Sequence, residues 1–250
     1  MSSITKLFPV LLLTLLVGCA STSNPDTWPA SEFYGQAQES MSIKDYQTAI
    51  KHYEDLEIHH PFSPYTQQAQ LEVAYAYYKY DEPDSAIAAA NRYIKLYPRT
   101  KDVDYAYYLR GLVSFERSMS SLDLTLGLDF SKRQPKTAKD AFQYFEDLIK
   151  RYPDSKYVND AKQRMLDIRN KLAQYELHAA NYYFRRGAYL SAAKRAQYVL
   201  ANYPQTPAIP DALIIMIKAY RQLGINDLAD DAFKVFKLNY PDHEAINNLN

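Results

Sequence analysis

The feature that most restricts the fold of this chain is a proline that recurs five times in the same local setting. Four copies read Tyr-Pro and one reads His-Pro, and the prolines lie 37, 55, 51 and 37 residues apart: Pro61, Pro98, Pro153, Pro204 and Pro241. Proline cannot continue an α-helix, and the Ser or Thr two residues after the first four is a good N-cap for a new one. Each copy therefore predicts that one helix ends and the next begins.

The residues before each proline also recur at fixed offsets. A small residue stands 12 positions before it, a small or aromatic residue 8 before, and an apolar residue 5 before; the respective sets are Ala49, Ala86, Ala141, Ala192, Ala229; Tyr53, Ala90, Phe145, Ala196, Phe233; and Leu56, Tyr93, Leu148, Val199, Phe236. This spacing is typical of the second helix of a tetratricopeptide repeat, TPR, whose period is about 34 residues. We predict an all-α, TPR-type α-solenoid of five helix pairs, about ten helices.

The predicted repeats span about 31–61, 64–98, 101–153, 156–204 and 207–241. Their first helices are expected at Phe33–Met41, Gln67–Tyr80, Val103–Arg117, about Val158–Arg186 and Asp211–Leu223, and only six of the 250 residues are glycine, which favours helices. Stacked helix pairs form a superhelix, and we expect first helices to line its concave groove. The long spacings predict an insertion in repeat three and a lengthened first helix in repeat four.

The insertion, Arg117–Pro135, has its own pattern. Apolar residues alternate there at Leu122, Leu124, Leu126, Leu128 and Phe130. A period of two predicts a strand or extended segment rather than a helix. The segment either plugs the floor of the groove or offers an edge or surface to a partner, and the sequence favours neither.

The only cysteine, Cys19, follows an apolar run, Leu7–Val17. That run is too short to span a bilayer but has the length of a signal-peptide core. Leu16-Val17-Gly18-Cys19 looks like a bacterial lipobox, which predicts a signal peptide at 1–18 and a diacylglyceryl thioether and an N-acyl chain on Cys19. The alternative, a core helix ending in a buried Cys, needs apolar partners that Ser21–Asn24 does not offer.

The lipid predicts where the protein sits. Two or three long acyl chains hold a protein on a membrane almost permanently. Ala20 and Ser21 follow the Cys, with no Asp at the second mature position, which resembles Gram-negative lipoproteins sent to the outer membrane. We expect a periplasm-facing protein on a flexible tether, residues 19–30, of which Ser21–Ala30 reaches at most about 33 Å.

Composition and motifs argue against nucleic-acid binding and catalysis. The chain has 29 basic and 29 acidic residues, without the positive excess of a nucleic-acid binder. None of its five histidines has metal-ligand spacing, and there is no phosphate loop, nucleophile elbow or distinctive carboxylate pair. Lipidation of Cys19 also leaves no free thiol. We predict no catalytic residue, no metal and no cofactor besides the covalent lipid.

One segment, Pro61–Tyr80, contains more tyrosine than packing requires. Its rings lie on several faces of a helix, so some should face the groove, where they and two glutamines can hold an extended peptide by stacking and hydrogen bonds. The candidates are Tyr65, Gln67, Gln68, Tyr75, Tyr77 and Tyr78. The alternative is that these rings only pack the repeats together.

Four longer strings carry a resemblance to a known family. They are PFSPYTQQAQLEVAYAYYK (61–79), DYAYYLRGL (104–112), QPKTAKDAF (134–142) and YYFRRGAYLSAAKRAQYVLANYP (182–204). With the lipobox and the repeats, they resemble the BamD family, the TPR lipoproteins of the outer-membrane β-barrel assembly (BAM) machinery. The strings are spread over nearly all of the mature chain.

The resemblance implies a non-enzymatic adaptor. In that family the N-terminal repeats receive unfolded outer-membrane proteins through a C-terminal targeting sequence that ends in an aromatic residue. The C-terminal repeats dock on the barrel-forming, BamA-type subunit, and another BAM lipoprotein lies along the surface. An arginine of the fourth repeat pairs there with an acidic residue of the barrel subunit. The matching residue is Arg195, and Lys194 is the neighbouring cation. His60 departs from the family, which often has Tyr before this proline.

Two other functions fit part of the sequence. An envelope scaffold that links the outer membrane to peptidoglycan or to a division complex would fit the lipobox and the repeats equally well, and only the four strings disfavour it. A cell-wall enzyme would need an isolated groove carboxylate, and none stands out.

Overall fold

The computed structural model describes residues 27–121 and 135–249. These residues form ten α-helices, and no strand occurs among them. The helices are α1 (Ala30–Ser42), α2 (Tyr46–His59), α3 (Pro64–Lys79), α4 (Pro83–Leu96), α5 (Val103–Ser121), α6 (Lys136–Arg151), α7 (Val158–Arg185), α8 (Tyr189–Asn202), α9 (Ile209–Gln222) and α10 (Asn226–Asn239). The predicted all-α class and helix count are confirmed.

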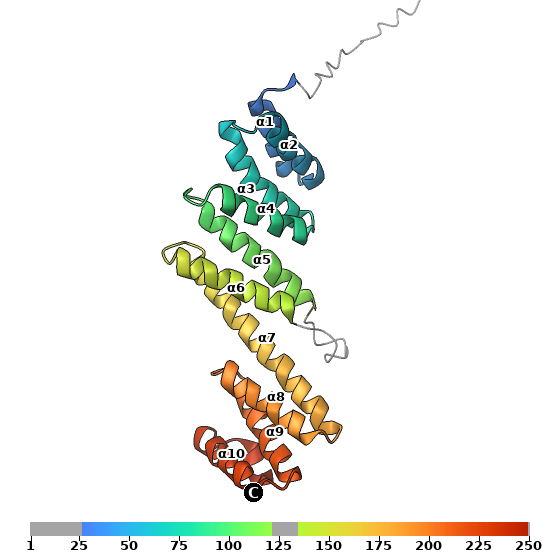
Figure 1. Ribbon diagram of the computed structural model, residues 1–250, viewed down its shortest axis with the longest axis vertical. Coiled ribbons are helices and arrows are strands. Elements are labelled where there is room, and N and C mark those ends of the chain that lie inside the picture. The colour runs from blue at the N-terminus through green and yellow to red at the C-terminus, as the bar shows by residue number, and fades with distance from the viewer. Residues whose placement is uncertain (1–26, 122–134, 250) are drawn as a thin grey trace, which may run out of the picture.

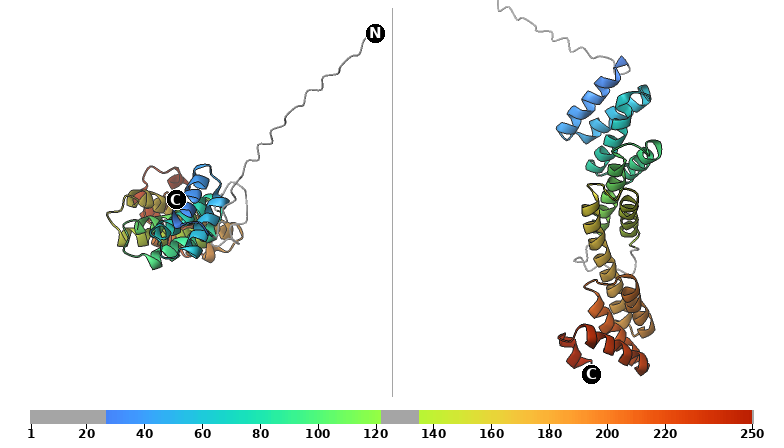
Figure 2. Two further views of the ribbon diagram at one scale, coloured as in Figure 1. Left: turned by 90° about the horizontal axis from the view of Figure 1, so that it is seen from above. Right: turned by 90° about the vertical axis from the view of Figure 1, so that its left-hand side faces the viewer.

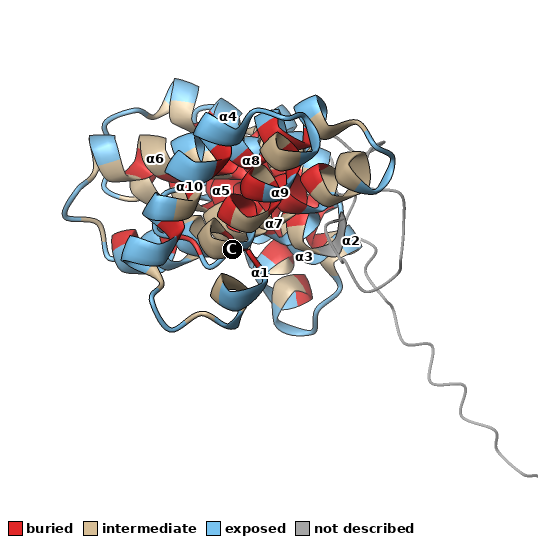
Figure 3. Ribbon diagram, turned by 90° about the horizontal axis from the view of Figure 1, so that it is seen from below, coloured by how far each residue is buried: buried red, intermediate tan, exposed pale blue. Residues whose placement is uncertain are grey.

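The helices stack one after another into an elongated superhelix (Figures 1 and 2). The helix pairs occupy about the same residues as the five predicted repeats. Viewed along the long axis, the buried residues lie in the centre and the exposed ones around them (Figure 3). The core is therefore a column between the helix layers, and the first helices of successive repeats, α1, α3, α5, α7 and α9, contact one another along it.

The positions found before each proline are core positions. All five alanines at offset 12 and all five apolar residues at offset 5 are fully buried. Small side chains let neighbouring helices approach, and large apolar ones fill the space between them. At the α7–α8 and α9–α10 turns, Gly187 and Gly224 have φ values of +74° and +71°, which glycine adopts without a steric penalty. The repeat pattern thus encodes both the core and these turns.

The insertion begins later than the sequence indicated. Helix α5 does not end near Arg117 but continues to Ser121, so the first residues of the predicted extended segment are helical. No proline or glycine interrupts the helix there, and Phe115 and Ser118 are buried on its inner face, which favours continuing it. The alternating residues 122–130 lie outside the described residues.

The long first helix of repeat four is α7, with 28 residues. Its N-terminal half packs against α5 and α6, and its C-terminal half packs against α8 and α9. In Figure 1 α6 crosses one part of α7 and α8 lies beside another. The two ends of the solenoid are therefore joined through a single continuous helix.

The end of the predicted tether is packed against the first repeat. The Trp28 ring lies 5.3 Å from that of Phe33 and 5.7 Å from that of His52. His60 donates a hydrogen bond from Nε2 to the Trp28 carbonyl at 2.8 Å. Trp28–Ala30 thus belongs to the solenoid, because an indole gains more by burial than by exposure to water. Cys19 and the signal peptide lie outside the described residues.

The C-terminal end is closed by a short 3-10 helix, Glu244–Asn248, that the sequence pattern did not predict. Leu249, which follows it, is buried with Phe236 and Ile217. This segment covers part of the last repeat. Among the described helices, none is both long and apolar enough to cross a membrane.

Candidate functional site

The first candidate site is a hollow of about 420 Å³ on the first helices, which we call the groove pocket. Its walls come from α3, from the α4–α5 turn and α5, and from Tyr157, just before α7. The lining residues are Gln68, Leu71, Glu72, Tyr75, Lys101, Asp102, Tyr105 and Tyr157. The pocket combines three aromatic rings with amide, carboxylate and ammonium groups, which suits a peptide that offers both backbone and side chains.

Glu72 connects the groove pocket to the first repeat. Its carboxylate accepts hydrogen bonds from Tyr53 at 2.7 Å, Tyr34 at 3.1 Å and Gln68 at 2.8 Å, and also from Gln38. The donors belong to α1, α2 and α3, so one carboxylate ties three helices together. Charge-assisted hydrogen bonds are stronger than neutral ones. This network holds one wall of the pocket in place.

The opposite wall is a stack of rings. Tyr108 and Tyr157 lie nearly parallel with 4.7 Å between ring centroids, and Tyr105 lies 5.5 Å from Tyr157. The Tyr108 hydroxyl donates to Asp160 at 2.7 Å, and Arg164 bonds the same carboxylate at 2.6 Å. These contacts therefore fix the orientation of the rings.

The six candidate groove residues lie in different environments, and only some of them line the groove pocket. Gln68 and Tyr75 line the groove pocket. Tyr65 is 40% exposed and packs against Tyr34, with ring centroids 5.3 Å apart. Tyr78 packs against Tyr75 and donates to Glu116 at 2.8 Å. Gln67 is half-buried outside the groove pocket.

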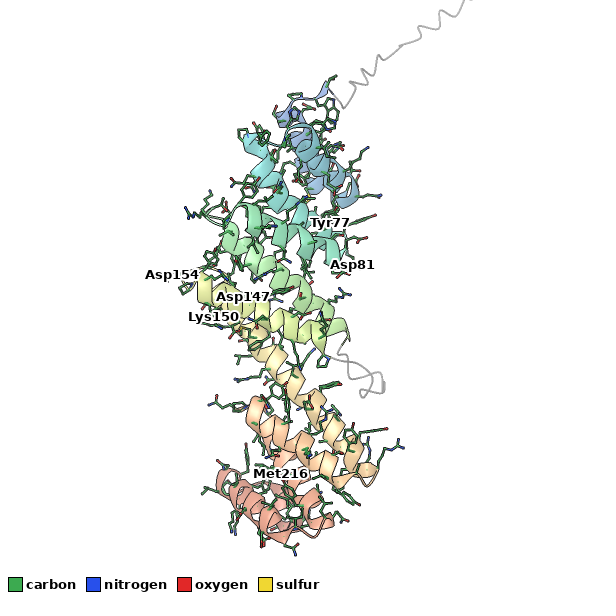
Figure 4. The ribbon with its side chains drawn as sticks, viewed as in Figure 1. Tyr77, Asp81, Asp147, Lys150, Asp154 and Met216 are labelled. Atoms are coloured by element: carbon green, nitrogen blue, oxygen red, sulfur yellow. The ribbon has the colours of Figure 1, made fainter. Side chains whose placement is uncertain are left out.

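Tyr77 has a different environment. Its hydroxyl donates to Glu54 of α2, and two residues along a helix point to nearly opposite sides, so it faces away from Tyr75. In Figure 4 it lies near Asp81, where α3 ends. Of the three tyrosines at 75, 77 and 78, the first lines the pocket, the third adjoins it and Tyr77 lies outside it.

The network changes the acidity of the hydroxyls. Burial, together with the charge of Glu72 and the hydrogen bond to it, raises the pKa of Tyr34 to about 12, and burial with the Glu54 bond raises the pKa of Tyr77 to about 12. Burial and the Asp160 bond raise the pKa of Tyr108 to about 12. Burial likewise raises the pKa of Tyr53 and Tyr105. All of these hydroxyls stay protonated donors throughout the physiological range.

These shifts predict a loss of stability at high pH. The folded protein binds the Tyr34 proton more tightly than the unfolded chain, whose tyrosines titrate near 10. The stabilisation is therefore complete below pH 10 and disappears as pH rises from 10 to 12. We expect the wild type to melt at a higher temperature than Tyr34→Phe at pH 8, and the difference to vanish near pH 12. Thermal unfolding followed by circular dichroism measures it, and an unchanged difference at pH 12 would contradict the assignment.

The second candidate site surrounds Arg195 between α7 and α8, and we call it the arginine pocket. It has a volume of about 310 Å³ and is lined by Tyr183, Ser191, Lys194, Arg195 and Tyr198. The Arg195 Nη1 donates to Glu176 at 2.7 Å, and the side chain of Glu176 is only 8% exposed, whereas that of Arg195 is 44% exposed. The hydrogen bond to Glu176 raises the pKa of Arg195 further. Glu176 thus holds a permanent cation at the surface.

Lys194 lies beside Arg195 on the same wall but is exposed and forms no ion pair with any residue that the structure describes. The two cations differ physically, because Arg195 is oriented by a buried carboxylate and Lys194 is a flexible point charge. Arg195 is therefore the better oriented of the two.

The described residues contain no group of three or more His, Asp or Glu side chains arranged to hold a metal ion. The histidines of the first repeat serve packing: His59 stacks on Phe33 with 5.4 Å between ring centroids. Many carboxylates form ion pairs four residues along a helix, such as Asp160 with Arg164.

Sequence reasoning missed the residues that hold these sites. It did not single out Glu72, Tyr34, Tyr105 or Tyr157 as groove residues, nor Glu176 as the partner of Arg195. The sequence did contain one sign that Glu72 belongs to the groove. Gln68, Glu72 and Tyr75 are spaced at i, i+4 and i+7, so they share a helix face. The partners on other helices left no such signal.

Several known proteins are similar to this chain over most of its length. A family model described as outer membrane lipoprotein, YfiO, matches residues 26–235. The outer membrane protein assembly factor BamD of Neisseria meningitidis serogroup A is 40% identical over 243 residues, covering 92% of this chain and 91% of that protein. The proteins of the same name from Xylella fastidiosa strain Temecula1 and Vibrio cholerae serotype O1 are 38% and 36% identical, covering 95% and 92% of this chain and 83% and 96% of theirs.

Proposed function

This chain belongs to the BamD family of outer membrane lipoproteins, and we propose that it is a non-enzymatic assembly factor for outer-membrane proteins. In this proposal Cys19 carries the lipid and holds the protein on the periplasmic side of the outer membrane. The N-terminal repeats bind unfolded clients, and the C-terminal repeats bind the barrel-forming subunit, with other BAM lipoproteins alongside. No covalent bond of the client changes.

The observation that carries the proposal is the groove pocket. An unfolded outer-membrane protein offers an extended segment whose backbone groups are unpaired and whose side chains alternate. Tyr75, Tyr105 and Tyr157 give rings on which a client side chain can stack, while the exposed Gln68 amide offers a polar group to its backbone. Tyrosine suits this role because each ring has an apolar body and a polar tip. In this way the pocket binds a client segment that is still extended and has not yet paired with another strand.

Lys101 can bind the terminal carboxylate of the client. It lies on the rim of the pocket, is exposed, and forms no ion pair among the residues described. A client that ends in an aromatic residue would place its ring against Tyr75 and Tyr105 and its terminal carboxylate against Lys101. Opposite charges at such a rim contribute mainly to specificity and to the rate of encounter.

The arginine pocket is the proposed docking point for the barrel subunit. It is formed by α7 and α8 and shares no lining residue with the groove pocket, so a subunit bound there leaves the groove pocket accessible. Arg195 presents guanidinium donors to an acidic residue of that subunit. Anchoring both proteins at one membrane raises their effective concentration. The adaptor therefore passes a bound client to a neighbour that is already attached.

Client binding tests this function with a matched pair on one helix. Tyr75→Ala removes a ring from the groove pocket, and we expect it to weaken binding of a peptide with a C-terminal phenylalanine about tenfold. Tyr77→Ala removes a ring that faces Glu54 instead and should bind as the wild type does. Fluorescence anisotropy with the full-length lipoprotein in detergent measures both, after circular dichroism confirms equal helicity.

Amidation of the peptide terminus checks the role of Lys101. It should weaken binding to the wild type and have no further effect on Lys101→Gln. If Tyr75→Ala binds the free-acid peptide as tightly as the wild type, the groove pocket is not the client site.

A further inference from the structure

A third hollow lies between α6 and α8, and neither the groove nor the arginine pocket accounts for it. We call it the interhelix cavity. Its volume is about 330 Å³, and its walls include Lys139 and Phe142 of α6, Arg169 and Leu172 of α7, and Tyr198 of α8. None of its lining residues belongs to the groove pocket.

The length of α7 explains why this cavity exists. Helix α7 has 28 residues, twice the length of α8. Because α7 is this long, α6 and α8 both pack on it, and they do so more than on one another. The cavity is the space left between them over Arg169 and Leu172.

The cavity holds positive charge without a counterion. The Nε of Arg169 is buried and has no hydrogen-bond partner. Among the described residues, neither Arg169 nor Lys139 takes part in an ion pair, whereas Arg110, Arg164 and Arg195 each bond a carboxylate. A buried donor without a partner is costly, so native structures rarely leave one.

The carboxylates of α6 already take part in ion pairs, and α8 has none. On α6, Asp140 pairs with Lys136, Glu146 with Lys150 and Asp147 with Arg110. Helix α8, Tyr189–Asn202, contains no acidic residue. Among the described residues, therefore, neither α6 nor α8 has a carboxylate left for Arg169, and its charge is available to an anion from a partner.

We propose that the interhelix cavity binds an acidic side chain of a protein partner, an Asp or Glu with an apolar residue beside it. The carboxylate bonds Arg169 and Lys139, and the apolar residue packs on Phe142, Leu172 and the Tyr198 ring. A guanidinium fork matches a carboxylate with two parallel hydrogen bonds. At protein interfaces, aromatic and arginine side chains in well-packed, desolvated pockets contribute most of the binding energy.

The occupant is the subunit that docks at Arg195, and in this respect the inference rests on the proposed function. Tyr198 lines both the arginine pocket and the interhelix cavity, so the two hollows adjoin on one surface. A partner with one acidic residue at each hollow bridges α6, α7 and α8. Its contact on Arg169 would also fix the position of the fourth repeat relative to the third.

Copurification of the barrel subunit with the affinity-tagged, full-length lipoprotein in mild detergent tests the cavity. We expect Arg169→Glu and Lys139→Glu each to lower the amount of copurified subunit at least about tenfold, in line with close charge pairs at other interfaces. Arg169→Lys keeps the charge and should retain most of it. Lys171→Glu is the control, because two residues along α7 point to the other side of the helix. Equal helicity and melting temperature show that each variant is folded.

The outcomes separate this inference from the docking proposal. If Arg195→Glu lowers copurification and Arg169→Glu behaves like the wild type, the cavity is not part of the interface and the proposed function stands. If Arg169→Glu lowers it and Arg195→Glu does not, the cavity is supported and docking at Arg195 is overturned. Loss with both variants, and not with Lys171→Glu, supports both sites.

Discussion

Replacing Gly111 with leucine is expected to lower the free energy of unfolding by about 3 kcal/mol or more, the upper part of the range for overpacked cores. Gly111 lies in α5 where this helix meets α6. A Cβ atom there would stand 2.7 Å from two ring carbons of Phe145, closer than non-bonded carbons approach. Phe145 is fully buried and packs against Tyr108 and Phe115. The ring cannot move aside, so the two helices must separate.

Gly35 provides the matched control, because it is also a glycine within a helix. No atom lies within 4 Å of a Cβ built at this position of α1. Gly35→Leu should leave the protein unchanged or stabilise it by about 0.5–1 kcal/mol, since leucine favours the helix more than glycine does. Urea denaturation of the two variants should give opposite signs. Equal stability of Gly111→Leu and the wild type would show that α5 and α6 do not pack as closely as described.

Arg195→Glu is expected to lower copurification of the barrel subunit at least about tenfold. The substitution reverses the charge that the partner's acidic residue meets. The structure adds a second effect, because Glu176 is buried and Arg195 is its cation. A carboxylate at position 195 would face Glu176 at close range, so a lower melting temperature should accompany the loss of docking.

A second variant separates docking from stability. In Arg195→Gln with Glu176→Gln, a neutral hydrogen-bonded pair replaces the ion pair and leaves no buried charge unpaired. We expect it to melt near the wild-type temperature and still to lose the barrel subunit. Lys194→Glu tests the neighbouring cation, and we expect a smaller loss. Full copurification with the double variant would show that the charge of Arg195 is not what the partner recognises.

The order of helices followed from local rules. Proline is tolerated in the first turn of a helix but interrupts it further along, and residues three and four apart share a helix face in any context. For this reason Pro98 and Pro153, together with the alanines 12 residues before them, were enough to predict helix pairs and their buried faces. The boundary at Arg117 was misplaced because the prediction relied on a period of two that begins at Leu122. Nothing in the helix itself required it to stop earlier.

The candidate sites followed from the sequence only in part. The dense tyrosines of α3 pointed to the correct helix, but Tyr77 proved to face Glu54 while Tyr75 faces Tyr105. The resemblance identified Arg195, but not Glu176, which lies 19 residues away on the preceding helix. A helix's own periodicity says which residues share a face, and not which neighbour that face meets.

By itself, then, the sequence determined the class of the fold, the number of helices and the residues of the core, because these depend on interactions within a few residues along the chain. The tertiary structure decided which rings meet in the groove pocket, which carboxylate bonds each hydroxyl, and that a cationic cavity opens between α6 and α8. Those features depend on the angles and offsets at which helices pack. Contacts between side chains about 20 to 50 residues apart in the sequence determine these angles and offsets. A lengthened α7 was readable from the spacing of prolines, but the cavity beside Arg169 appears only once α6 and α8 are both placed on that helix.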